Sequence, residues 1–188
     1  MDHFHYHNGE LHAEDVPLAR IAQQVGTPVY VYSRATLERH AQVFREGLSE
    51  LPSVHLAFAV KSNPNLAVLK VLKEQGFGAD VVSEGEMRRA LAAGIPAADI
   101  VFSGVGKTRR ELAAALEARI GQFNLESEEE GEELAALAAE RGVTAPCALR
   151  VNPDVEAGTH AKISTGKAEN KFGVPYDRAA EMFDRLAR

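Results

Sequence analysis

From Val54 onward the chain repeats one pattern, in which a short run of apolar, β-forming residues is followed by a longer segment with helical periodicity. Turn and capping residues separate the two members of each pair, so each pair is predicted to be one strand–helix unit. Five such units follow one another. Because strands that alternate with helices form parallel sheets through right-handed crossovers, the chain is predicted to have an α/β fold.

The expected strands cover residues 54–60, 79–82, 100–102, 120–125 and 147–151. The expected helices cover 66–74, 108–118, 128–141 and 175–188, and a further helix opens at Ser83–Glu86 with the spacing of a capping box. Two architectures fit this order, a (β/α)8 barrel of the TIM type and an open, flavodoxin-like sheet of five strands. A typical barrel needs about 250 residues, so a barrel here would be incomplete, with about five of its eight units.

Polar residues at the strand ends favour the barrel. They are Lys61, Asp80, Ser83, Ser103, Asn124, Arg150 and Asn152. Barrel active sites use residues from the ends of many strands, whereas an open sheet concentrates its site at one switch point. We therefore predict a partial TIM-type barrel with its functional site at the rim where the strands end.

The first 33 residues follow a different pattern. They are predicted to form a hairpin with strands at 4–7 and 10–12, a helix over 16–25 and another strand over 29–32. The hairpin turn would be Asn8-Gly9, a dipeptide typical of two-residue turns. We expect residues 1–33 to contribute strands to a second, β-rich domain and residues 34–188 to form the partial barrel.

Charge and cysteine content narrow the classes of partner. Lysine and arginine number 21 and aspartate and glutamate 27, which gives a net charge of −6 and argues against binding to nucleic acid or anionic membranes. No apolar run approaches the roughly 20 residues of a spanning helix, and the first residues lack the pattern of a signal peptide. The only cysteine, Cys147, excludes an intrachain disulfide. We expect a cytoplasmic protein with a small-molecule partner.

Lys61 is the first candidate catalytic residue. It follows a mostly apolar run and precedes Ser-Asn-Pro-Asn, so its amine would emerge at the rim. A lysine amine in such a place can lose its proton, attack a carbonyl and form a Schiff base. The same spacing fits a lysine that simply extends to solvent. Asp80 could orient that amine or lie against a bound ring, or it could be a turn residue after Gly78.

The run Gly104–Thr108 has some features of a phosphate-binding loop. The full pattern requires another glycine where the chain has Val101, so nucleotide hydrolysis is not predicted. The start of the following helix could still attract an anion. The acidic run Glu126–Glu133 is interpreted as a solvated helix face whose charges favour the helix dipole.

The remaining candidate functional segments are three alternating histidines and one long loop. His3, His5 and His7 would share one strand face, which we interpret as solvated, so no metal site is predicted. The expected loop Asn152–Gly173 is too long for a simple connection and is predicted to be an active-site cover or binding loop.

Six stretches, in order along the chain, together resemble the diaminopimelate decarboxylases, a bacterial branch of the barrel-type pyridoxal-phosphate-dependent decarboxylases. They cover residues 58–63, 79–86, 102–108, 124–127, 150–154 and 160–166, the last followed by Lys-Phe-Gly at 171–173. The first stretch is similar across the whole superfamily. The runs Ser-Gly-Val-Gly-Lys and Lys-Ile-Ser-Thr-Gly resemble this branch in particular.

The resemblance implies that Lys61 carries pyridoxal 5'-phosphate as a Schiff base, that Asp80 lies near the cofactor and that Arg150 lines its pocket. It also implies that Lys171, with His160 in the same loop, faces the partner subunit of a homodimer. The implied activity is decarboxylation of meso-2,6-diaminopimelate to L-lysine and CO2, the last step of lysine biosynthesis.

Three alternatives stay open, namely an ornithine or arginine decarboxylase, an amino-acid racemase, and a non-catalytic relative that binds the cofactor. The later parts of the family, among them its glycine-rich phosphate loop, have no counterpart in these residues. We therefore expect the chain to be the amino-terminal part of a longer enzyme and to be inactive by itself.

Overall fold

A computed structural model describes residues 2–152 and 173–186. The N-terminal elements are β1 (Phe4–His7), β2 (Glu10–Ala13), β3 (Val16–Pro17), α1 (Leu18–Val25) and α2 (Arg34–Glu46). They are followed by β4 (Ala57–Ala59), the 3-10 helix η1 (Val60–Ser62), α3 (Leu66–Glu74), β5 (Gly78–Val81), α4 (Glu84–Ala92), η2 (Ala97–Asp99), β6 (Ile100–Phe102), α5 (Arg109–Ala118), β7 (Gln122–Leu125), α6 (Glu128–Arg141), β8 (Cys147–Leu149), β9 (Val151–Asn152), β10 (Val174–Pro175) and α7 (Tyr176–Leu186).

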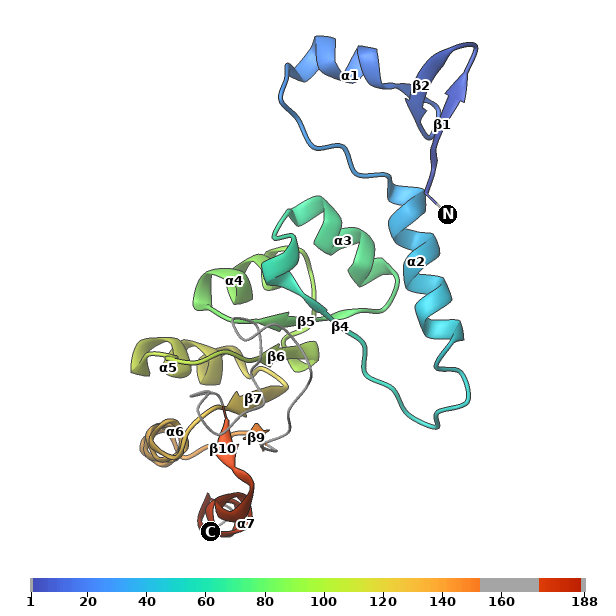
Figure 1. The fold of residues 1–188 in the computed structure, drawn as a ribbon. Coiled ribbons are helices and arrows are strands. Elements are labelled where there is room, and N and C mark those ends of the chain that lie inside the picture. The colour runs from blue at the N-terminus through green and yellow to red at the C-terminus, as the bar shows by residue number, and fades with distance from the viewer. Residues whose placement is uncertain (1, 153–172, 187–188) are drawn as a thin grey trace.

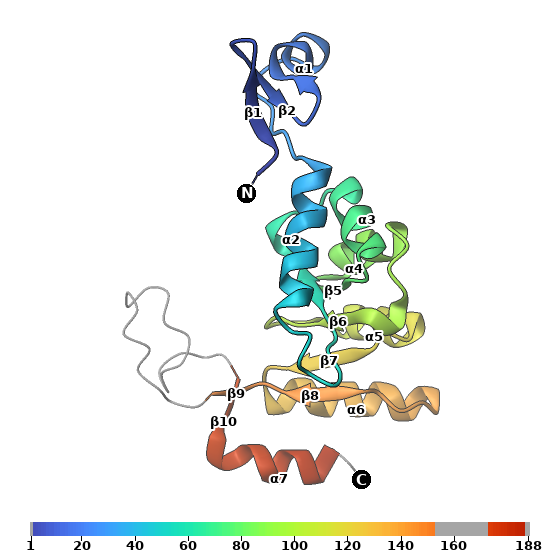
Figure 2. The same ribbon diagram turned by 90° about the vertical axis from the view of Figure 1, so that its right-hand side faces the viewer.

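Five parallel strands form one sheet in the order β4-β5-β6-β7-β8, which is also their order along the chain. Helices α3, α4, α5 and α6 follow one another along one side of this sheet (Figures 1 and 2). A flavodoxin-like sheet would have a different strand order, with helices on both faces. The sequential order is that of a barrel wall, so the open-sheet alternative is wrong.

The helices that follow the strands begin at side-chain caps. Asn65, Ser83, Thr108 and Ser127 each accept a hydrogen bond from a backbone N–H of the first helical turn. Only α5 has a complete capping box, between Thr108 and Glu111. The box expected at Ser83 is half formed, because the Glu86 carboxylate accepts from the backbone N–H of Val82 instead of that of Ser83.

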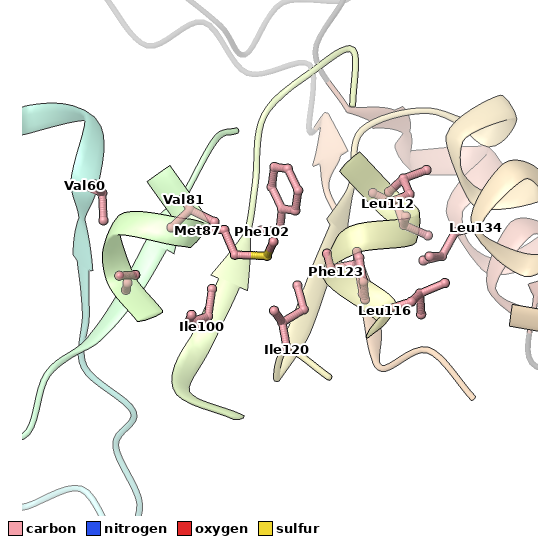
Figure 3. Close-up of a cluster of buried hydrophobic side chains, with 14 of the residues drawn as sticks. Val60, Val81, Met87, Ile100, Phe102, Leu112, Leu116, Ile120, Phe123 and Leu134 are labelled. Carbon is pink, nitrogen blue, oxygen red and sulfur yellow. The ribbon is translucent and has the colours of Figure 1, made fainter. Parts of the chain in front are cut away.

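The core lies between the sheet and the helices that cover it. Strand residues alternate between this core and the opposite face, and those that point to the core are fully buried: Ala79, Val81, Ile100, Phe102, Phe123 and Leu125. Figure 3 shows part of this core, where Phe102 and Phe123 lie among side chains of the helices such as Met87 and Leu112. The opposite face of the strands is therefore the one that carries polar side chains.

Two glycines allow tight packing where strands begin. A Cβ added to Gly121 would lie 1.9 Å from the carbonyl oxygen of Ala98, and one added to Gly78 would lie 2.1 Å from that of Asp99. Neither position has room for a side chain. These glycines therefore let η2 approach the starts of β5 and β7.

The N-terminal hairpin is confirmed. β1 and β2 pair antiparallel, and the turn residues Asn8 and Gly9 have φ angles of 49° and 82°, as a two-residue turn requires. The helix predicted over residues 16–25 begins only at Leu18. The reason is Pro17, which is extended and pairs with β2 as part of β3. Figures 1 and 2 show β1–β3 and α1 as a cluster beyond the start of α2, away from the five-stranded sheet.

The strand predicted at Val29–Tyr32 is wrong for the described residues. These residues carry no regular secondary structure, and Tyr30 is 89% exposed. The sequence has the residue types of a strand, but a strand forms only where a neighbour provides hydrogen bonds, and none of the described strands pairs with this segment.

The first and fifth strands of the sheet differ most from the predicted extents. The first covers only Ala57–Ala59 of the predicted 54–60, because η1 begins at Val60. The fifth is divided at Arg150 into β8, which pairs with β7, and β9, which pairs with β10. Most of the predicted loop 152–173 lies outside the described residues.

Candidate functional site

The polar residues predicted at the strand ends lie on the face of the sheet that is turned away from the helices. Asp80 sits between Ala79 and Val81, both fully buried in the core, so its side chain points to the other face. The same alternation places Ser103 beyond Phe102, and Asn124 between Phe123 and Leu125, on that face. In a barrel this face lines the interior, and the ends of the strands form the rim that carries active sites.

Lys61 is the second residue of η1, two residues beyond the end of β4. Its neighbour Ala59 pairs with Asp80 in the parallel register, and η1 contacts β5. The side chain of Lys61 is exposed, and within the described residues no hydrogen bond or ion pair involves its amine, including with Asp80. The amine is therefore available to react with a molecule at the rim.

A chain of hydrogen bonds crosses three strands at the rim. Ser103 Oγ donates to Asp80 Oδ1 at 2.5 Å, and Asn124 Nδ2 donates to Ser103 Oγ at 2.9 Å. Gln122 Nε2 in turn donates to Asn124 Oδ1 at 2.7 Å. Of these four partly buried side chains, the sequence singled out Asp80, Ser103 and Asn124 separately, and the structure brings them together. Their hydrogen bonds fix the orientation of the Asp80 carboxylate.

Arg150 forms an ion pair with Glu126, a residue that was predicted to lie on a solvated helix face. Its Nη1 lies 2.9 Å from Glu126 Oε2, and the side chain of Glu126 is only 3% exposed. The other oxygen of Glu126 accepts from the backbone N–H of Gly104 at 3.0 Å. Glu126 is thus a buried rim residue and not part of a solvated helix face. The sequence could have revealed this position, because Gln122, Asn124 and Glu126 alternate along and just beyond β7 and every second residue of a strand lies on the same face.

Lys107 lies in the run Gly104–Thr108, just before the helix whose start could attract an anion. Lys107 is buried, with a side chain 1% exposed, and its Nζ donates to Glu130 Oε1 and to the carbonyl oxygens of Gly104 and Asn124 at 2.5–2.8 Å. All three protons of this ammonium group therefore have partners within the protein. Lys107 stabilises the loops after β6 and β7 and is not available to an anion. Glu130, 8% exposed, is a second exception to the predicted solvated face.

The remaining candidate residues are the two loop residues His160 and Lys171 and the N-terminal histidines. His160 and Lys171 lie outside the described residues. His5 stacks on His12 with ring centroids 6.0 Å apart, whereas His3, which precedes β1, contacts Thr36. Among residues 2–152 and 173–186, no group of three or more His, Cys, Asp or Glu side chains is arranged to hold a metal ion. No helix in these ranges is long and apolar enough to cross a membrane.

The rim residues fit an aldehyde cofactor that carries negative charge. Lys61 offers an exposed amine for covalent attachment, and Asp80 offers a carboxylate of fixed orientation on the neighbouring strand. Arg150 adds a guanidinium at the end of β8, held by Glu126. The described residues thus combine a nucleophile, an acceptor and a cation in or just beyond the strands of a parallel sheet.

Fold and rim together define a partial β/α barrel whose strand ends carry a reactive lysine. Residues 34–188 match the family described as the pyridoxal binding domain of pyridoxal-dependent decarboxylases, so the chain belongs to this family. It is 53% identical, over its whole length, to the diaminopimelate decarboxylase of Vibrio cholerae, and 42% identical over 97% of its length to that of Aquifex aeolicus. The chain spans 45% and 43% of the length of these two relatives.

Solved structures agree with this assignment. A diaminopimelate decarboxylase from M. jannaschii, in complex with L-lysine, matches the whole chain with a TM-score of 0.87 and 34% identity, and the match covers 45% of that structure. The enzyme from Helicobacter pylori, also with L-lysine, matches 89% of the chain with a TM-score of 0.83 and 39% identity, over 42% of its own length. These matches confirm the predicted fold class and the predicted family.

Proposed function

We propose that this chain is part of a pyridoxal-phosphate-dependent enzyme that converts meso-2,6-diaminopimelate to L-lysine and CO2. The observation that carries the proposal is the exposed amine of Lys61 at the rim, two residues beyond Ala59, whose pairing partner Asp80 has a carboxylate held in place. Identity of 53% to a relative named diaminopimelate decarboxylase supports the choice of substrate over ornithine or arginine.

Each rim residue would have a separate task. Lys61 would hold the cofactor through its Nζ and would lie beside the reacting carbon, where its amine would hold or deliver a proton. Asp80 would accept hydrogen bonds and orient the neighbouring amine. Arg150 would supply positive charge to the pocket from a position fixed by Glu126. Pyridoxal phosphate, when bound, supplies an electron-withdrawing ring that accepts the electron pair left by the departing carboxylate.

The other expectations from the sequence are part of the same proposal. Residues 1–33 would contribute to a second, β-rich domain, and residues 34–188 would form the cofactor-binding part of a barrel. In a homodimer, His160 and Lys171 would lie near the partner subunit. Lysine biosynthesis and a chain with a single cysteine are both consistent with a cytoplasmic location.

The test is turnover of meso-diaminopimelate by the full-length protein with pyridoxal phosphate, followed as release of CO2 and lysine. Lys61→Ala should abolish turnover, whereas Lys70→Ala, which removes an exposed lysine of α3, should leave it unchanged. Full activity in Lys61→Ala would refute the proposed role of Lys61. Faster turnover of ornithine or arginine would favour those substrates, and cofactor binding without turnover of any of these amino acids would indicate a non-catalytic relative.

A further inference from the structure

The hydrogen-bond chain behind Asp80 has a direction. Gln122 donates to Asn124, Asn124 donates to Ser103, and Ser103 donates to Asp80. Because the amide of Asn124 already donates to Ser103 Oγ, the single hydroxyl proton of Ser103 is left for the carboxylate. Every donor in the chain thus points toward the one group that carries a full charge.

Ser103, Asn124 and Gln122 are polar side chains at positions that would be apolar in a barrel wall with no functional role. Interior positions of barrel strands are usually occupied by branched apolar residues, which need no partners. A partly buried serine, asparagine and glutamine instead require hydrogen bonds, since an unsatisfied polar group inside a protein is costly. In this chain the requirement is met by one connected set that ends at Asp80.

The location of Asp80 connects this set to the reactive amine. Asp80 pairs with Ala59, and Lys61 lies two residues further along the chain in η1, which contacts β5. Ser103, just beyond β6, donates its hydroxyl hydrogen bond to Asp80 Oδ1. The carboxylate is therefore held on its β6 side, and its remaining acceptor positions are left for a group at the rim.

We propose that Ser103, oriented by Asn124, is a positioning residue that fixes the Asp80 carboxylate for its task beside Lys61 and the bound cofactor. The proposal rests on the proposed function and extends it to two residues whose side chains lie behind Asp80. Ser103 acts through Asp80 and touches neither substrate nor cofactor. Its loss should impair the chemical step more than the binding of substrate.

The experiment uses full-length protein loaded with pyridoxal phosphate. Ser103→Ala removes the donor to Asp80, Ser103→Thr keeps a hydroxyl group, and Asn124→Leu keeps the size of the side chain without its hydrogen bonds. Ser127→Ala is the matched control, because it removes a serine hydroxyl group from the start of α6 without contact to the chain of hydrogen bonds. Three quantities are measured for each variant: the visible circular dichroism of the bound cofactor, kcat and KM for meso-diaminopimelate, and the melting temperature.

The expected result is a loss of kcat with little change in KM. Ser103→Ala should lower kcat about tenfold to a hundredfold, as expected for loss of a hydrogen bond to a charged group, with KM within about threefold of the parent. The visible circular dichroism should change, because the cofactor then lies against a reoriented carboxylate. Ser103→Thr should restore most of both signals, and Asn124→Leu should show a smaller loss than Ser103→Ala. Ser127→Ala should lower only the melting temperature.

Parental circular dichroism and kcat in Ser103→Ala would overturn the proposal, as would a pure loss of thermal stability like that of Ser127→Ala. If Ser103→Ala does not fold, Asn124→Leu decides the question, and parental values in that variant contradict a positioning role. The spectroscopic result does not depend on the substrate. A parent protein that binds the cofactor but does not decarboxylate diaminopimelate would refute the proposed function and would still test Ser103.

Discussion

Replacing Glu130 by Gln is expected to lower the free energy of local opening of the loops after β6 and β7 by about 3 kcal/mol. Lys107 and Glu130 form an ion pair in which the side chains are only 1% and 8% exposed. Removing one partner of a buried pair costs about 3–5 kcal/mol, because the other charge stays buried without compensation. The lower end of this range applies, since the new amide oxygen can still accept a hydrogen bond from Lys107 and the carbonyl oxygens of Gly104 and Asn124 remain.

The effect is local, so the assay is amide hydrogen exchange of the full-length protein, followed at residues 103–108 and 124–130. A loss of 3 kcal/mol in the free energy of local opening corresponds to exchange about a hundredfold faster. The matched control is Glu38→Gln, which breaks the exposed pair with Arg34 and should change local stability by less than about 0.5 kcal/mol.

The double variant Lys107→Met/Glu130→Gln, compared with the two single variants, measures the interaction energy between Lys107 and Glu130. Both charges are then absent, so its cost should be at least about 1 kcal/mol smaller than the sum of the two single costs. The reasoning is refuted if Glu130→Gln and Glu38→Gln accelerate exchange to the same extent, or if the two single costs simply add.

Three further changes test other parts of the structure. Gly121→Ala should cost several kcal/mol and lower the melting temperature strongly, because the added Cβ would lie 1.9 Å from a carbonyl oxygen, whereas Gly85→Ala in α4 has room and should be neutral or stabilising. Hydrogen bonds, first from the backbone of Thr108, hold the pKa of Glu111 below its usual value. The ionised carboxylate therefore stabilises the fold above the unfolded-state pKa, and this contribution is lost as the pH falls through the lower folded-state pKa. Glu111→Gln should consequently be less stable than the parent near pH 7 in denaturant unfolding, by less than about 1 kcal/mol because solvent screens this partly exposed carboxylate, and the difference should shrink in acid; a constant difference would contradict this cause. Burial raises the pKa of the Cys147 thiol, so its alkylation near pH 8 should be slower than that of a small free thiol, and an equal rate would contradict the burial.

The fold was predictable because its determinants are local and repeat. Helices α3 and α6 cover the residue ranges expected for them, since apolar periodicity and the caps Asn65 and Ser127 lie in the sequence itself. The choice of a barrel over an open sheet followed from polar residues at many strand ends. The segment Val29–Tyr32 was not predictable in the same way, because a strand depends on a pairing partner that its own residues do not specify.

The site was predictable residue by residue, but its connections were not. Asp80 and Ser103 could each be singled out by position, yet the bond between them depends on the register of β5 and β6. Glu126 was missed because it is the first residue of an acidic run, which indicates a solvated helix face. Its alternation with Asn124, which indicates the polar face of the sheet, was not used. The role of Lys107 was not predicted, since the sequence does not reveal that Glu130 accepts a hydrogen bond from its amine.

The central claim is that the amine of Lys61 binds an aldehyde cofactor at the rim. Full-length protein loaded with pyridoxal phosphate can be treated with borohydride, which fixes the attached cofactor, and then digested for peptide mapping by mass spectrometry. The account predicts loss of the visible absorbance band and a phosphopyridoxyl group on Lys61. A label on another lysine, such as Lys70 or Lys107, or no covalent label at all, would contradict it.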